Sequence, residues 1–78
     1  MLESERAEAL ILRGWYRTTT GDHNAAVSDL TKAIRLEPDD FNAYTVRGQS
    51  HEALGKTDEA IADYGQAIRI APSNAQGW

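Results

Sequence analysis

The 78-residue chain has no cysteine and only two prolines, one methionine and one phenylalanine. The absence of cysteine excludes disulfides and thiolate-bound metals. No apolar run approaches the ~20 residues that span a bilayer, so we expect no membrane partner. The first six residues are too polar for a secretory signal, which favours a cytoplasmic location. A core in so short a chain rarely contributes more than ~3–5 kcal/mol, and such chains usually need a staple, a metal or a partner.

Basic residues are also scarce. Eight Lys and Arg against twelve Asp and Glu give a net charge of −4 and a pI near 4.9. Proteins that bind a phosphate backbone show clustered Lys and Arg. We therefore expect no nucleic-acid partner.

The chain does contain an internal repeat. When residues 7–40 are laid over residues 41–74 without a gap, ten of 34 positions are identical. The shared landmarks include Arg-Gly, Asp, Ala-Ile-Arg and a closing Pro in the same register. A period of ~34 residues is typical of stacked helical arrays.

Apolar spacing near 3.6 residues predicts two helices in each repeat. The first helix should cover residues 7–19, and Gly21 and Asp22 should end it and cap the second. Pro38 should stop the second helix. Asp39 or Asp40 should cap a third helix over residues 41–54, with Tyr44, Gly48, His51 and Leu54 on its packed face. Gly55 should end that helix, Thr57 should cap the fourth, and Pro72 should close it.

Small residues recur where two helices must come close. Gly14 and Gly48, with Ala26 and Ala60 on the following helices, should let the backbones approach, while Leu30 and Tyr64 fill the space beside them. A glycine inside a helix costs about 0.5–1 kcal/mol, which implies a packing reason.

Two charged residues also recur at this period. Arg13 and Arg47 should lay their stems on the helix pair and direct the guanidinium toward Asp29 or Asp63.

These residues resemble a pair of tetratricopeptide repeats. The pattern of the family falls on Leu10, Gly14, Ala26, Leu30, Ala33 and Pro38, and again on Tyr44, Gly48, Ala60, Tyr64, Ala67 and Pro72. The resemblance implies an all-α fold of two stacked antiparallel helix pairs, a right-handed α-solenoid segment. Residues 1–6 would be an extension, 7–40 and 41–74 the repeats, and 75–78 the start of a third. Arg17 and His51 depart from the pattern, because the family usually has an aromatic residue there.

The resemblance also implies a non-enzymatic module that binds a peptide or protein surface in a concave groove, without a cofactor. The residues expected to line that groove are Glu8, Ile11, Trp15, Thr18, Asn42, Thr45, Gln49 and Glu52. Some members hold a C-terminal carboxylate there with Lys, Asn and Arg, but the matching positions here are Ile11, Trp15, Asn42 and Val46. That clamp is absent. Trp15, whose repeat equivalent is Gln49, either anchors a peptide, or folds over the N-terminal segment or fills space left by irregular packing.

The C-terminal end suggests a second function. Trp78 falls where a third repeat would place its first large residue, so the fourth helix would expose apolar surface. Either the chain is a fragment of a longer array, or another copy covers this face in a homo-oligomer. The candidate self-association residues are Ile61, Ile68 and Trp78.

Other motifs carry little chemistry. The segment 50–57 matches a phosphate-binding loop except at Ser50, where that loop needs a glycine, and it follows a helix instead of a strand. His23 and His51 are far apart in sequence, and neither has a second histidine three or four residues away. A metal site needs at least three convergent ligands, so neither histidine indicates one. The acidic residues around Pro38 lack the spacing of a calcium loop. No serine has a histidine and an acid at a suitable spacing, so we expect no enzyme and no metal site.

Overall fold

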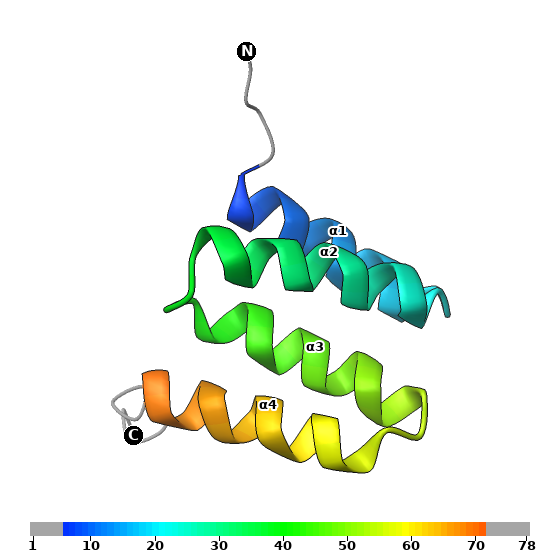
Figure 1. The fold of residues 1–78 in the computed structure, drawn as a ribbon. Helices are drawn as coiled ribbons and strands as arrows, with labels where there is room; N and C mark the ends of the chain where they lie inside the picture. Colours follow the sequence, from blue (N-terminus) through cyan, green and yellow to red (C-terminus); the bar gives the residue numbers. More distant parts are fainter. Residues whose placement is uncertain (1–5, 72–78) are drawn as a thin grey trace, which may run out of the picture.

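The computed structural model describes residues 6–71, and these residues form four helices. They are α1 (Ala7–Thr19), α2 (His23–Leu36), α3 (Phe41–Ala53) and α4 (Thr57–Ile70). Figure 1 shows two helical hairpins, α1 with α2 and α3 with α4, stacked one below the other. The predicted all-α fold of two stacked antiparallel helix pairs is confirmed. Pro72 and Trp78, to which the sequence assigned roles, lie outside the described residues.

Both predicted glycine turns are present. Gly21 has a φ of 97° and Gly55 a φ of 80°, and both follow the last turn of the first helix of a pair. A left-handed backbone is strained for residues that carry a Cβ. This conformation lets the chain reverse within three residues at each turn.

The predicted helix caps are confirmed only in part. The Asp40 side chain accepts a hydrogen bond from the backbone N–H of Asn42 at 3.0 Å, as expected. Asp22 occupies the cap position of α2, but its side chain makes no capping bond. The Thr57 prediction is wrong by one residue, because Lys56 is the cap of α4 and Thr57 is already helical. The ψ angles of Asp22 and Lys56, 67° and 72°, depart from the extended backbone of a typical N-cap.

Each helix pair is built around a glycine. A Cβ at Gly14 would lie 2.8 Å from Cγ of Leu30, and a Cβ at Gly48 would lie 2.7 Å from Cε1 of Tyr64. The close approach predicted from the sequence is therefore present. The large side chains of Leu30 and Tyr64 lie directly over the two glycines.

Helix α3 is the central element, because it contacts all three other helices. Ala43 and Ser50 are fully buried and Val46 nearly so. The single packed face predicted for this helix is therefore incomplete, and the helix also ends one residue early, at Ala53. A helix that is covered on more than one side has no clear apolar stripe to read.

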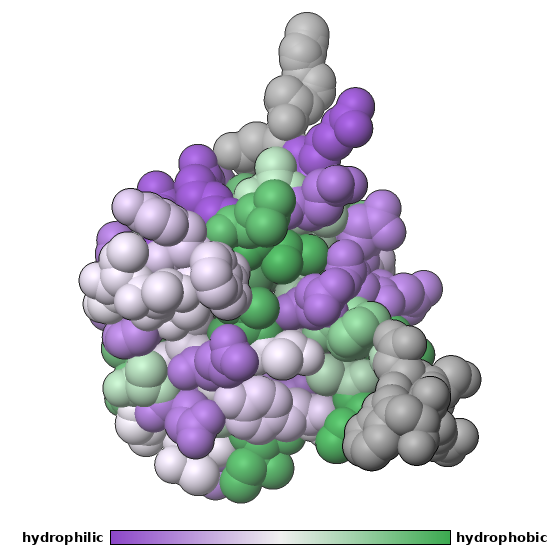
Figure 2. Space-filling model, turned by 180° about the vertical axis from the view of Figure 1, so that it is seen from behind, coloured by the Kyte–Doolittle hydropathy of each residue, from purple (hydrophilic) through white to green (hydrophobic). Residues whose placement is uncertain are grey.

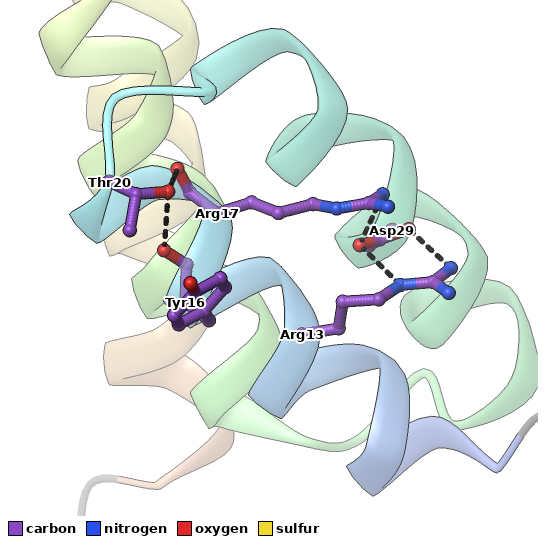
Figure 3. Close-up of polar contacts among 5 residues, drawn as sticks. All are labelled: Arg13, Tyr16, Arg17, Thr20 and Asp29. Carbon is purple, nitrogen blue, oxygen red and sulfur yellow. Dashed lines mark hydrogen bonds and ion pairs between the residues drawn. The ribbon is translucent and has the colours of Figure 1, made fainter.

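Buried carboxylates join the helices of each pair. Asp29 accepts hydrogen bonds from Nε and Nη2 of Arg13 at 3.0 and 2.9 Å, and from Nη1 of Arg17 at 3.0 Å (Figure 3). Asp63 accepts from Nε and Nη2 of Arg47 at 2.9 and 2.8 Å. The predicted direction of both guanidinium groups is confirmed.

Candidate functional site

The α1 and α3 helices contact each other, and a pocket of about 420 Å³ lies between them. Its lining residues are Ile11, Leu12, Trp15, Asn42 and Val46. Three of them, Ile11, Trp15 and Asn42, belong to the groove predicted from the sequence. The pocket is therefore built from four apolar side chains and one amide.

Floor and wall of this pocket differ in exposure. Ile11 and Val46 are buried, with 9% and 8% of their surface exposed, and they belong to the main core cluster. Trp15 is 52% exposed and Leu12 is 66% exposed. The floor is held rigidly by the core, while the two larger side chains offer apolar surface at the pocket edge. Figure 2, which views the molecule from the α1 side, shows hydrophobic side chains in a strip between hydrophilic ones.

The other five predicted groove residues do not line this pocket. Three of them make local contacts instead: Thr18 Oγ1 lies 2.6 Å from Nδ1 of His23, Thr45 Oγ1 donates to the carbonyl of Phe41, and Glu52 accepts from the Tyr64 hydroxyl. Gln49 is exposed, and Glu8 lines a neighbouring pocket. Their part in a groove stays a prediction.

Sequence reasoning missed Leu12 as a groove residue. It directly follows Ile11 and precedes Trp15 by three positions, so it lies on the same helical face as Trp15. Its repeat equivalent Val46 is buried, whereas Leu12 is exposed. The available signal was the run of apolar residues at positions 11, 12 and 15, which is wider than one buried stripe of α1 requires.

Among residues 6–71, no Lys or Arg lines the pocket. The three arginines of α1 and α3 that follow these positions, Arg13, Arg17 and Arg47, are ion-paired within the helix pairs. The hydrogen bond to Asp63 is the main cause that raises the pKa of Arg47 above its ordinary value. The α1/α3 pocket is therefore apolar, and its neighbouring cations point elsewhere.

A second pocket, of about 520 Å³, lies at the start of α1 and α3. Its lining residues are Arg6, Ala7, Glu8, Leu36, Glu37 and Asp40. Three carboxylates thus face one guanidinium. We call this the acidic pocket.

The self-association candidates lie on α4. Ile61 is 63% exposed and Ile68 is 64% exposed. Both belong to the face whose repeat equivalents in α2 are Val27 and Ile34. Ile34 packs against the core cluster, and Thr31 between them accepts a hydrogen bond from Arg47 of α3 at 3.3 Å. A surface that α3 covers in the first pair is thus open in the second, as far as the described residues extend.

Within residues 6–71 there is no group of three or more His, Asp or Glu placed to hold a metal ion. His51 lies beside Asp63, with Nε2 3.7 Å from Oδ2, and its buried Nδ1 has no hydrogen-bond partner. No helix in this part of the chain has the length and apolar character needed to cross a membrane.

A family model of the tetratricopeptide repeat matches residues 11–75. None of the curated proteins matches the chain. The matched segment contains nearly all of the four helices, both glycine contacts and both arginine–aspartate pairs. Repeats of this family generally mediate protein–protein interaction and are typically non-enzymatic. The chain belongs to the tetratricopeptide repeat family.

Proposed function

We propose that the α1/α3 face binds a peptide segment of a partner protein, with an apolar side chain of that segment in the pocket beside Trp15. The observation that carries this proposal is the exposure of Trp15, 52%, at the edge of a pocket whose floor is fixed by the core. Half-exposed tryptophan is typical of residues that anchor a partner. Asn42 adds an amide that can pair with the backbone of an extended peptide.

The test is Trp15→Ala, with Tyr16→Ala as the matched control. Both residues are exposed aromatics on α1, but only Trp15 lines the pocket. We expect Trp15→Ala to weaken peptide binding by ≥2 kcal/mol, because truncating an anchor removes most of its contact area. Binding by Tyr16→Ala should stay near that of the wild type.

Thermal melts of the same variants complete the test. An exposed side chain contributes little to folding, so Trp15→Ala should change the free energy of unfolding by no more than ~0.5 kcal/mol. A loss of ~3–5 kcal/mol would instead assign Trp15 to the core and remove the main support for the groove.

A second candidate function is self-association through the open ends of the helix stack. Ile61 and Ile68 are exposed on α4, and Leu12 and Tyr16 are exposed on α1. The repeat equivalents of the latter two are Val46 and Ser50, which are buried in α3. A second copy that placed its α1 on α4 would reproduce the α2–α3 contact already present within one chain.

Light scattering tests this candidate. The double variant Ile61→Asp/Ile68→Asp should lower the measured mass toward that of the 8.6 kDa monomer, because charge cannot be buried in an apolar contact. Ala62→Asp, at an exposed neighbouring position, is the control and should leave the mass unchanged. A wild-type chain that is monomeric at millimolar concentration would exclude self-association.

A further inference from the structure

We propose that the partner segment is basic as well as apolar: one large apolar side chain enters the α1/α3 pocket, and a lysine or arginine of the same segment enters the acidic pocket. This inference rests on the proposed function, since it assigns the chemistry of the peptide that the groove would bind.

The two pockets are lined by residues about one helical turn apart on α1. Glu8 lines the acidic pocket and precedes Ile11 and Leu12 by three and four positions. Residues at these spacings lie on the same helical face, about one turn of 5.4 Å apart. A peptide side chain seated against Leu12 therefore has the Glu8 carboxylate about one helical turn away.

Residues close in sequence at the start of α3 also line the two pockets. Asp40 lines the acidic pocket, and Asn42 lines the apolar one. The backbone N–H of Asn42 donates to Oδ1 of Asp40 at 3.0 Å. At the start of α3, this hydrogen bond links one residue of each pocket. Along α1, Glu8 of the acidic pocket and Leu12 of the apolar pocket are four positions apart.

The charges favour a cationic ligand. Within residues 6–71, no side-chain hydrogen bond or ion pair engages the carboxylates of Glu8 and Glu37. Of the described residues that line the acidic pocket, Arg6 carries a cation and Glu8, Glu37 and Asp40 carry carboxylates. The described residues that line the apolar pocket include no cation. An acidic segment would be repelled here, whereas a lysine or arginine would gain two or more carboxylate partners.

Exposed ion pairs are weak individually, so the basic residue sets the choice of partner more than the affinity. The apolar pocket provides the contact area. The acidic pocket then discriminates among apolar segments by the charge of their neighbouring residues. A segment with a glutamate in place of the lysine or arginine should be rejected.

A peptide-display selection tests this inference with the full 78-residue chain and a random 12-residue library. The wild type should enrich peptides that carry a Leu, Ile, Met or aromatic residue with a Lys or Arg within four positions. The charge-reversed variant Glu8→Lys/Glu37→Lys should instead enrich peptides with Asp or Glu near the apolar residue. Trp15→Ala serves as the background selection.

The outcomes separate the two proposals. Enrichment of apolar peptides without any charge preference, abolished by Trp15→Ala, would support the groove and overturn the basic-segment inference. No enrichment above the Trp15→Ala background would overturn both. Peptides that bind equally well to wild type and charge-reversed protein would also overturn the inference.

A selected basic peptide gives the quantitative test by titration calorimetry. Glu8→Gln and Glu37→Gln should each weaken binding about two- to fivefold, and the loss should shrink in high salt. Glu59→Gln is the matched control, because it removes the same charge from an exposed position in the first turn of α4. An equal loss of affinity for Glu59→Gln would show that binding depends only on the net charge of the protein, and it would overturn the assignment of the basic residue to the acidic pocket.

Discussion

The two helix pairs hold the same carboxylate in the same register, but with different cations. In the first pair, Asp29 is bound by two arginines, Arg13 and Arg17. In the second, Asp63 is bound by Arg47, while His51, the equivalent of Arg17, lies 3.7 Å away. Both carboxylates are nearly inaccessible, with 3% and 6% of their side-chain surface exposed. One pair therefore has a spare cation, and the other relies on a single arginine.

The pairs also differ in how they are enclosed. The core cluster draws on α1, α2 and α3 and includes no residue of α4. Helix α2 is packed between α1 and α3, whereas α4 contacts α3 alone among the four helices of the described residues. Tyr64 takes the place of the fully buried Leu30 and is only partly buried. The same repeat therefore packs closely where it has neighbours on both sides and more loosely where it does not.

The sharpest test of the charge difference is Arg47→Met against Arg13→Met. Arg47→Met should cost about 3 kcal/mol in the free energy of unfolding, since it leaves a buried carboxylate without its main cation. It also removes the hydrogen bond to Thr31 and the contact with the Tyr44 ring, whose centroid lies 5.7 Å from Cζ of Arg47. Arg13→Met should cost about 1 kcal/mol or less, because Arg17 still binds Asp29. Urea unfolding at pH 7 measures both.

Equal losses of stability for the two variants would show that Arg17 does not compensate for the loss of Arg13 at Asp29. The replacement of His51 by arginine sharpens the test, because it gives the second pair the cation arrangement of the first. In the Arg47→Met background, His51→Arg should restore part of the lost stability.

A smaller effect is expected from overpacking the close helix contacts. Ala26→Leu and Ala60→Leu should each destabilise the protein by ~1–3 kcal/mol, because both alanines are buried. Ala26→Leu should lie at the upper end, since α2 is enclosed on two sides and α4 can move outward. Ala62→Leu, at an exposed position of α4, is the control and should be nearly neutral. Thermal melts that rank Ala60 above Ala26 would contradict the difference in enclosure.

The smallest effect concerns Tyr64 at high pH. Burial, the hydrogen bond to Glu52 and the charges of Glu52 and Asp63 raise the pKa of Tyr64 from 10.0 to about 12. The folded state therefore keeps this proton more tightly than the unfolded state, and its stabilising effect is present below pH 10 and lost between about pH 10 and 12. Over that range the stability of Tyr64→Phe should fall less steeply than that of the wild type. Parallel slopes in alkaline urea titrations would contradict this assignment.

Much of the fold could be predicted from the sequence. The 34-residue period and the turn residues placed the four helices within one or two residues of their observed ends. Pro72, which was predicted to close the fourth helix, lies outside the described residues. Gly21 and Gly55 were assigned to the turns because few other residues adopt a positive φ. The partners of Arg13 and Arg47 followed from the recurrence of both charges at the same spacing. These features depend on local conformation or on the repeat itself, so one sequence contains them.

The exposure of individual side chains was decided by the tertiary structure. Leu12 and Val46 occupy equivalent positions, yet one is 66% exposed and the other 8%. The sequence cannot distinguish the two positions. Helix α2 packs against the face of α3 that contains Val46, whereas no helix of the described residues covers the equivalent face of α1. The pocket beside Trp15 has the same origin. It exists only because α1 and α3, separated by an intervening helix in the chain, are brought into contact by packing.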